Sequence, residues 1–366
     1  MKPKVVLILG KVPPPYMGPS IATEILLKSG LNNNFNLIHV DTKVNSDLKD
    51  IGKWSFEKIK NYYIIWKRLI EKIKTHQPDL VLIPISQSTI GFLKDSIFIL
   101  IAKFYKRKTL LHLRGSDFRN WLIKTNKINQ WYVRTCLNST NGIIVLGNNL
   151  RPVFKNIYAD DKIFVAPNGG NYLIPSRTRE SNILRILYLG NLQSSKGIED
   201  VIDASVILQK SHANKFELEV IGGWRKDDIK QKCLRIIDDN NLPVHFTPPE
   251  LSKNKLQELS NADIFVFPPR EPEGHPWVII EAMAASLPII STDQGAIIES
   301  VQEGKNGFIV PSANPKSIAE KMAILIDNEE LRQRMGVESR KSYEAKFTEK
   351  VMVENLSRIF NIVISQ

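Results

Sequence analysis

Short apolar runs alternate along the chain with longer stretches in which apolar residues recur every three or four positions. Runs of roughly four to eight apolar residues are typical of buried parallel strands, and the longer periodic stretches are typical of helices that cover a sheet. The pattern therefore predicts an α/β protein made of repeated strand–helix units. The strands predicted for the first half cover residues 5–9, 37–40, 80–84, 109–113, 142–146 and 163–166. Those predicted for the second half cover residues 184–190, 216–221, 244–247, 262–267, 288–291 and 308–311.

The two series of strands are separated by residues 171–182, a polar segment without periodicity that is typical of an interdomain linker. A chain of 366 residues is also long for a single core, because cores stop growing at roughly 250–300 residues. We therefore expect a first domain over residues 1–170, a second over residues 171–345, and a C-terminal helix over residues 346–366.

The composition is that of a soluble globular protein, with 43% hydrophobic and 24% charged residues. The first apolar run ends at proline and suits a buried strand better than a signal peptide, and no run approaches the roughly 20 apolar residues that span a bilayer. Cys136 and Cys233 lie in different halves without metal-ligand spacing. We expect a reduced, cytoplasmic protein without a disulfide.

The formal charge is uneven: it is +15 for residues 1–170 and −3 for residues 171–366, and residues 51–150 alone carry +12. Within the basic part, residues 54–74 mix lysines and arginines with aromatic and aliphatic residues. Two interpretations are open: a helix on an anionic membrane surface, or a helix packed on the sheet of its own domain. No nucleic-acid-binding motif accompanies the charge, so we expect no nucleic-acid partner.

The most informative motif is the run from Arg270 to Ala284, which contains Glu273 and, eight positions later, Glu281. Two prolines end the strand at residues 262–267, and an amphipathic helix is predicted to begin near Pro276. Glu273 then lies in a loop at the carboxyl end of a strand, where open α/β sheets bind ligands. An ionised carboxylate accepts hydrogen bonds from paired hydroxyls, as sugars and riboses present them. The alternative is a pair of solvated surface carboxylates.

Lys196 lies in a second loop of this kind, residues 190–199, which follows the strand at residues 184–190 and precedes a helix. A cation there, with the amides at the helix start, suits an anionic group such as a diphosphate. If the diphosphate is a leaving group, these charges stabilise the transition state more than the ground state. The alternative is an ordinary solvated lysine.

Together these runs resemble the retaining glycosyltransferases of the GT-B fold, family 4 type (glycosyl transferases group 1), whose signature is two glutamates separated by seven residues. The resemblance implies two Rossmann-like domains facing across a cleft, with Glu281 on the donor ribose and Glu273 near the donor sugar. It also implies that Lys196 binds the donor phosphates. Asn191 stands where the family usually has an arginine, and Arg270 is one candidate to supply the missing charge.

The segment around Pro276 also departs from the family pattern, because proline has no amide proton to offer a phosphate. The amides of Trp277 and Val278 remain available as donors. His275 is a candidate contact for the donor sugar, and the alternative is a histidine that only supports the turn.

The first domain carries weaker signals of the same family. Gly18 lies in a loop that resembles the glycine-rich loop near the donor phosphates, where a plain turn is the alternative. The segment ending in Gly115, Ser116 and Asp117 resembles one whose preceding residue is a histidine close to the reacting carbon. Here Arg114 stands in that place, and His112, two residues earlier on the same strand face, is the other candidate.

The resemblance implies transfer of a sugar from a nucleoside diphosphate sugar to an acceptor hydroxyl, with the acceptor, a lipid-linked or surface-polysaccharide glycan, on the basic first domain. No Asp-x-Asp sequence is present, so we expect neither a metal nor another cofactor. A cytoplasmic location, peripheral on the inner face of the cell membrane, would suit such an acceptor. Two alternatives stay open: a non-hydrolysing sugar-nucleotide epimerase, and a catalytically inactive nucleotide-sugar-binding subunit.

Overall fold

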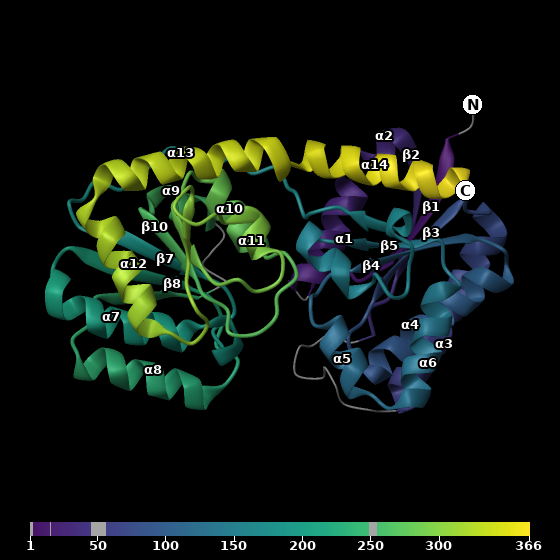
Figure 1. Cartoon of the computed structure of the whole chain (residues 1–366), viewed down its shortest axis with the longest axis horizontal. Coiled ribbons are helices and arrows are strands. Elements are labelled where there is room, and N and C mark those ends of the chain that lie inside the picture. The colour runs from purple at the N-terminus through teal and green to yellow at the C-terminus, as the bar shows by residue number, and fades with distance from the viewer. Residues whose placement is uncertain (1–2, 15, 45–55, 249–254) are drawn as a thin grey trace. The chain divides into compact units, whose positions relative to one another are not determined.

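The computed structural model describes residues 3–14, 16–44, 56–248 and 255–366, with the backbone alone at residues 56–59. The chain divides into two compact units (Figure 1). The first unit comprises residues 1–170 together with 349–366, and the second unit comprises residues 171–348. Trp54, one of the aromatic residues of the basic segment, lies outside the described residues.

The first unit is built on a six-stranded parallel sheet in the order β2-β1-β3-β4-β5-β6. Its strands are β1 (Lys4–Gly10), β2 (Phe35–Asp41), β3 (Leu80–Ile85), β4 (Lys108–Leu113), β5 (Gly142–Val145) and β6 (Ile163–Val165). Its helices are α1 (Gly18–Lys28), α2 (Leu31–Asn34), α3 (Phe56–His76), α4 (Thr89–Phe104), α5 (Phe118–Lys124), α6 (Lys127–Asn138) and α14 (Glu349–Ser365), with short 3-10 turns η2 (Asn148–Val153) and η3 (Asp160–Lys162).

The C-terminal helix α14 completes the core of the first unit. Alternate residues of β1, Val6 and Ile8, face one side of the sheet and join a buried cluster with Leu356 and Phe360 of α14. The ring of Phe360 meets that of Phe35 edge to face, with centroids 5.6 Å apart. A segment that ends the chain is therefore part of the core that positions the first strands.

Helix α3 packs its apolar stripe inside its own unit. Ile65, Leu69 and Ile73, spaced four residues apart, are each at most 2% exposed, and α3 lies against β2 and α4. Tyr63 and Ile64 remain exposed on the other side of the helix. The structure thus shows the packed interpretation of this basic segment and leaves part of its surface open.

The second unit has a second six-stranded parallel sheet, in the order β12-β11-β10-β7-β8-β9. Its strands are β7 (Leu184–Leu189), β8 (Phe216–Ile221), β9 (Val244–Thr247), β10 (Ile264–Phe267), β11 (Ile289–Ser291) and β12 (Gly307–Ile309). Its helices are α7 (Ile198–His212), α8 (Asp227–Asp239), α9 (Lys255–Asn261), α10 (Trp277–Ala284), α11 (Ile297–Ser300), α12 (Pro315–Asp327) and α13 (Glu329–Lys346), with one 3-10 turn η4 (Ser194–Lys196).

The predicted α/β class is confirmed, and each of the predicted strands is present with its ends shifted by at most two residues. Because all strands of a sheet run parallel, the loops that follow them meet at one edge of each unit. The loops after β7 and β10 are neighbours, since these two strands pair in the sheet. This adjacency brings the candidate residues of the second unit together.

Candidate active site

Two loops at the carboxyl edge of the second unit are tied to each other by the backbone. The amides of Arg270 and Glu271, after β10, both donate to the carbonyl of Ser195, after β7, at 3.0 and 3.4 Å. Gly197 ends the first loop in a left-handed conformation, with φ of 76°. A Cβ at this position would lie 2.0 Å from the carbonyl oxygen of Pro268. Glycine is therefore required here for the loops to approach.

Lys196 and Glu273 form an ion pair across these two loops, with the Lys196 ammonium donating to Glu273 Oε1. The two side chains are 24% and 14% exposed, so the ion pair is largely buried but remains partly open to solvent. Burial raises the pKa of the Glu273 carboxyl, and the Lys196 charge opposes that rise. The structure thus brings together two residues that lie 77 positions apart in the sequence.

Glu281 is on the second turn of α10 and is buried, with its side chain 4% exposed. Lys255, the first residue of α9, donates to its Oε1 at 2.6 Å. Its Oε2 is buried, and the Tyr172 hydroxyl is a neighbouring hydrogen-bond donor to this carboxylate. Burial, and then the neighbouring Glu281 charge, raise the pKa of the Tyr172 hydroxyl well above its ordinary value. Lys255 and Tyr172 are therefore neighbours of Glu281 that sequence reasoning missed.

Arg270 is engaged by a carboxylate. Its Nε and Nη2 donate to the two oxygens of Asp200 at 2.6 and 2.7 Å, and its Nη1 lies 3.7 Å from Glu199. The hydrogen bond to Asp200 raises the pKa of Arg270 further. This bidentate pair links the start of α7 to the loop after β10. Arg270 is consequently placed to hold the loops in position, and its charge is already matched.

Another arginine approaches Asn191, the residue that stands in the usual place of an arginine. Arg225, four residues beyond β8, donates from Nη2 to Asn191 Oδ1 at 3.2 Å. Its backbone amide donates to the carbonyl of Leu192 at 3.2 Å, which fixes it beside the same loop. The side chain is exposed, and its only hydrogen-bond acceptor among the described residues is a neutral amide, so its charge stays available. The sequence signal that could have identified Arg225 is a basic residue just after β8, the strand that pairs with β7.

His275 is enclosed inside the second unit, with 3% exposure. Its Nε2 lies 2.6 Å from Ser300 Oγ, and its ring centroid lies 5.1 Å from that of Phe347. Burial lowers the pKa of His275 to about 3, so the ring is neutral at ordinary pH. These contacts support the interpretation of His275 as a residue that holds the turn.

Trp277 and Val278 are the first two residues of α10, as the sequence predicted for the helix start. Amides in the first turn of a helix have no acceptor inside the helix, so they are oriented toward the loop before it. The predicted amphipathic character of α10 is wrong, because all of its residues except Val278 are buried. Helix α10 lies against α9, α11, α13 and β11, and these neighbours leave it no polar face.

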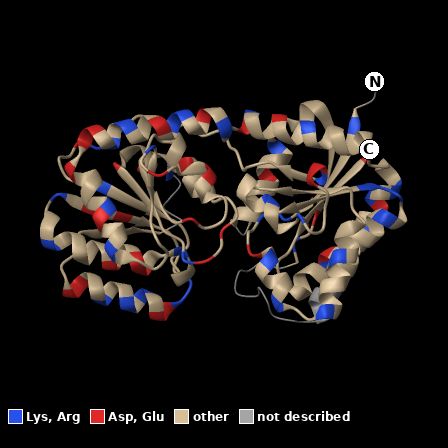
Figure 2. Ribbon diagram, viewed as in Figure 1, with Lys and Arg blue, Asp and Glu red and all other residues tan. Residues whose placement is uncertain are grey.

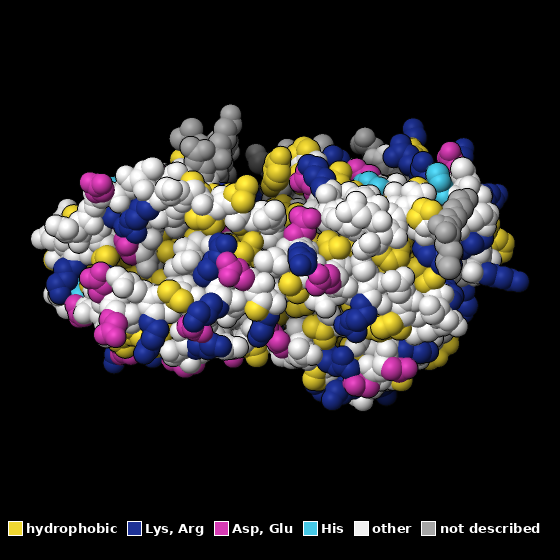
Figure 3. Space-filling view, turned by 90° about the horizontal axis from the view of Figure 1, so that it is seen from above, with side chains coloured by type: hydrophobic (Ala, Val, Ile, Leu, Met, Phe, Trp, Pro, Cys, Tyr) yellow, Lys and Arg dark blue, Asp and Glu magenta, His cyan; other side chains and the backbone are white. Residues whose placement is uncertain are grey.

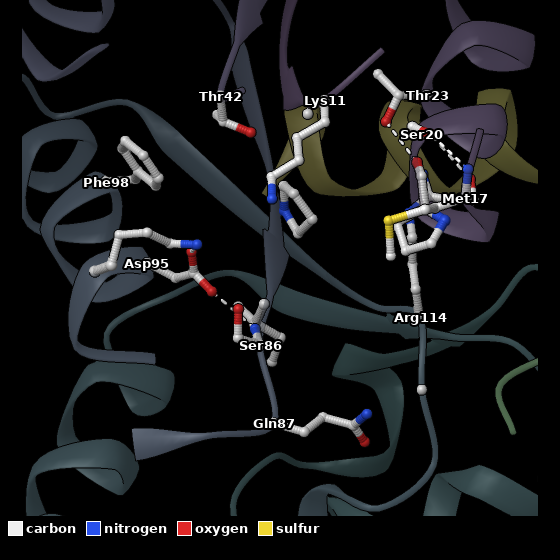
Figure 4. A pocket seen from close by; sticks show the side chains of 16 residues that line it. Lys11, Met17, Ser20, Thr23, Thr42, Ser86, Gln87, Asp95, Phe98 and Arg114 are labelled. Carbon is white, nitrogen blue, oxygen red and sulfur yellow. Dashed lines mark hydrogen bonds and ion pairs between the residues drawn. The ribbon is translucent and has the colours of Figure 1, made fainter. Parts of the chain in front are cut away.

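The first unit has a cavity of about 360 Å³ at the carboxyl edge of its own sheet (Figure 4). Residues after β1, β3 and β4 and residues of α1 and α4 line it. Gly18 opens α1 between the lining residues Met17 and Pro19. Asp95, in the same cavity, accepts from the amide of Ser86 at 2.8 Å and pairs with Lys94 at 3.0 Å.

Arg114 and His112, the two candidates from β4, have different surroundings. Arg114 lines the cavity, and burial lowers the pKa of its guanidinium to about 10. His112 is 4% exposed, and burial followed by the Arg114 charge lowers its pKa well below the ordinary value. Neither nitrogen of the His112 ring has a partner among the described residues. Only Arg114 of the two is among the residues lining the cavity.

Residues 175–342 match the protein family described as "Glycosyl transferases group 1". The second unit is a group 1 glycosyltransferase domain. This glycosyltransferase domain contains Lys196, Glu273 and Glu281 with their partners. The resemblance seen in the sequence is therefore confirmed over the part of the chain that carries its strongest motifs.

Similar proteins extend the comparison beyond this glycosyltransferase domain. The chain is 32% identical over 183 residues to the capsular polysaccharide biosynthesis glycosyltransferase CapM of Staphylococcus aureus, a match that covers 49% of this chain and 46% of CapM. It is 26% identical over 361 residues to the uncharacterized glycosyltransferase MJ1178 of Methanocaldococcus jannaschii, covering 94% and 95% of the two chains. The chain thus spans about half the length of CapM and nearly all of MJ1178.

Solved structures establish the fold of the whole chain. Anabaena HepE, solved in complex with UDP, superposes with a TM-score of 0.74 at 14% identity, covering 98% of this chain and 100% of HepE. The GT-B fold predicted from the sequence is confirmed by this likeness. Among the described residues, no helix combines the length and the apolar character needed to cross a membrane.

Proposed function

We propose that the chain is a retaining glycosyltransferase that moves a sugar from a nucleoside diphosphate sugar to an acceptor hydroxyl. The observation that carries the proposal is the pairing of Lys196 with Glu273, and of Lys255 with Glu281, at one sheet edge inside the glycosyltransferase domain. The UDP bound to HepE supports a uridine nucleotide as the first donor to test.

Different residues would bind different parts of the donor, according to their chemistry. Glu281, whose buried carboxylate lies beside Lys255 and the Tyr172 hydroxyl, suits a ribose hydroxyl that donates a hydrogen bond. Glu273 would accept from hydroxyls of the transferred sugar, and Lys196 would turn to the diphosphate as its charge develops. Lys196 and Glu273 pair with each other, so a bound donor would have to exchange partners with them.

The leaving diphosphate would help to deprotonate the acceptor, and the new bond would keep the anomeric configuration of the donor. The negative charge on the diphosphate would be met by Lys196, Arg225 and the first amides of α10. We propose no metal for this step, because these donors already suit an anion and the sequence has no Asp-x-Asp. Full activity in EDTA, and an unchanged anomer in the NMR spectrum of the product, are the expected results.

Donor binding tests the site directly. A panel of UDP-, GDP- and other sugar nucleotides would be titrated by calorimetry against the wild type, Glu281→Gln, and Glu330→Gln, whose carboxylate is exposed. We expect one donor to bind, with affinity lost in Glu281→Gln and kept in Glu330→Gln. Failure of every donor to bind would contradict the proposal. Turnover of the donor without acceptor would indicate the epimerase, and binding without transfer to any glycan acceptor would indicate the inactive subunit.

We further propose that the acceptor is a lipid-linked or surface-polysaccharide glycan, bound by the first unit on the inner face of the cell membrane. The word "capsular" in the name of CapM supports this acceptor class. Helices α3, α4 and α6, of which α4 contacts both of the others, carry lysines and arginines (Figure 2) and also expose large hydrophobic residues. Tyr63, Phe104 and Trp131 are 64%, 79% and 66% exposed. On the face seen in Figure 3, by contrast, hydrophobic side chains are scattered among charged ones.

Liposome sedimentation tests the membrane part of the proposal. Anionic vesicles at low salt should sediment the wild type, and added salt or neutral vesicles should weaken the binding. The double variant Phe104→Ser, Trp131→Ser should bind less, and Val337→Ser, a similarly exposed position in the second unit (52%), should bind as the wild type does. No sedimentation with anionic vesicles would contradict membrane association.

A further inference from the structure

Polar groups without partners gather at the carboxyl ends of β3 and β4. Among the described residues, four of the ten buried side-chain polar atoms that lack a hydrogen bond belong to Gln87, His112 and Ser116. Gln87 lines the cavity of the first unit and packs on Gly115, where an added Cβ would lie 1.9 Å from its Nε2. Buried polar atoms are nearly always paired in folded proteins. Of these three residues only Gln87 lines the cavity, so its unpaired Oε1 is the atom to which a ligand there could supply a partner.

Arg114 is the charged member of this group. Within the described part of the chain its guanidinium has neither a hydrogen bond nor an ion pair, and it lines the same cavity. Among the described residues that line this space, three are basic, Lys11, Lys94 and Arg114, and one is acidic, Asp95. Asp95 is already held by Lys94 and the Ser86 amide, so it does not neutralise Arg114 (Figure 4). A partly buried cation without a counterion is costly unless a ligand provides one.

We propose that this cavity binds an anionic group of the acceptor, a phosphate or a carboxylate, with Arg114 as its principal contact. The identification of the ligand as the acceptor rests on the proposed function, whereas the anion site itself follows from the cavity. The planar guanidinium offers paired donors that match two oxygens of either group.

The cavity also limits the size of the bound portion. Its volume lies near the lower end of the range for small-molecule sites, which suits one sugar-sized unit with an acidic substituent. Met17, Ile85 and Phe98 supply apolar walls, and the Thr42 hydroxyl adds a polar group. A neutral sugar would leave Arg114 unpaired on binding, so the cavity discriminates in favour of acidic acceptors.

The test compares glucose 6-phosphate, glucuronate and glucose as ligands of the full chain, with affinities measured by NMR titration. We expect at least one anionic sugar to bind about tenfold tighter than glucose, since a hydrogen bond to a charged group is worth roughly that factor. Preference for glucose 6-phosphate alone would assign a phosphate, and preference for glucuronate alone would assign a carboxylate. Equal binding of all three sugars, or no binding of any, would overturn the proposal.

Variants locate the preference in the first unit. Arg114→Gln should abolish the preference for anionic sugars. Arg114→Lys keeps the positive charge but loses the paired guanidinium donors, so it should reduce the preference. Arg119→Gln, an exposed arginine five residues away, and Lys196→Gln, in the second unit, should both keep it. A preference that survives in Arg114→Gln would refute the assignment. If the wild type fails to bind UDP but still prefers anionic sugars, the result would count against the proposed function and not against the anion site.

Discussion

The two units differ in whether the cations at their candidate sites have carboxylate partners. In the second unit, Lys196, Lys255 and Arg270 each have a carboxylate partner. In the cavity of the first unit, Arg114 has no partner among the described residues and sits beside further unpaired polar atoms. A site with matched charges keeps its geometry while empty, and ligand binding there must exchange one partner for another. A site with an unmatched charge gains its partner from the ligand, so it selects strongly for the sign of the ligand's charge.

Removing the Lys196 ammonium from the second unit is expected to have the largest effect among the variants that test this difference between the units. In Lys196→Met the diphosphate of the proposed reaction would lose the cation assigned to its developing charge, and Glu273 would lose its ion pair. We expect kcat to fall by about 10²–10³-fold, as for loss of one preorganised donor to a developing anion. Steady-state transfer assays would measure the change, with Lys226→Ala as an exposed control expected to match the wild type. A fall of less than about tenfold would show that the ion pair belongs to the fold and not to the reaction.

Most of the fold could be predicted from the sequence because its strands are buried on both faces. Runs such as Val5–Leu9 in β1 are uninterrupted by polar residues, and short runs of this kind are typical of buried parallel strands. The same logic failed for α10, where the residues around Glu281 were expected to leave a polar face. An acidic residue inside a buried helix is rare unless it is paired, and its partner Lys255 lies on another helix.

The candidate site was less predictable, since its contacts depend on which strands are neighbours. Glu273 and Lys196 were identified separately, but their pairing follows from the adjacency of β7 and β10, strands that are not consecutive in the chain. Arg225 was missed for a similar reason, because its approach to Asn191 depends on the pairing of β7 with β8. Spacing in the sequence does not encode strand order, so these partners appear only in the folded chain.

Each unit buries a histidine whose pKa is lowered by burial, His112 in the first and His275 in the second, which makes stability depend on pH. The pKa of His275 is about 3 in the folded chain, against an ordinary value of 6.5. Below pH 6.5 the unfolded state therefore binds a proton that the folded state does not, so stability falls as the pH drops toward about 3.

We expect His275 to contribute a loss of about 1.4 kcal/mol per pH unit over this range. Urea denaturation followed by circular dichroism from pH 7 to pH 5 would measure it. The variant His275→Gln, whose amide can still bond Ser300, should show a shallower decline than the wild type. Parallel declines for the two proteins would mean that His275 titrates normally.

Lys255→Met tests the matched charge at Glu281. The variant leaves a buried carboxylate without its cation, which costs about 3–5 kcal/mol in fully buried pairs. Because the Lys255 side chain is 40% exposed, water replaces part of the lost interaction, and we expect a loss of about 1–2 kcal/mol in urea denaturation. Lys341→Met removes an exposed pair with Glu338 and should change stability by less than about 0.5 kcal/mol. Equal effects of the two variants would indicate that the Glu281 pair is as solvated as a surface pair.

Arg225 is expected to have the smallest effect, and it is the exception to the matched charges of the second unit. Its guanidinium is exposed and bonded to the neutral Asn191, so it should attract a diphosphate through a screened interaction. We expect Arg225→Ala to weaken UDP binding about three- to tenfold in calorimetry at low salt, with a smaller effect at high salt. Placing the charge in the loop itself, in the double variant Asn191→Arg, Arg225→Ala, should restore the affinity. If the double variant stays as weak as Arg225→Ala, the two positions do not serve the same phosphate, and Asn191 is then a structural residue of the loop.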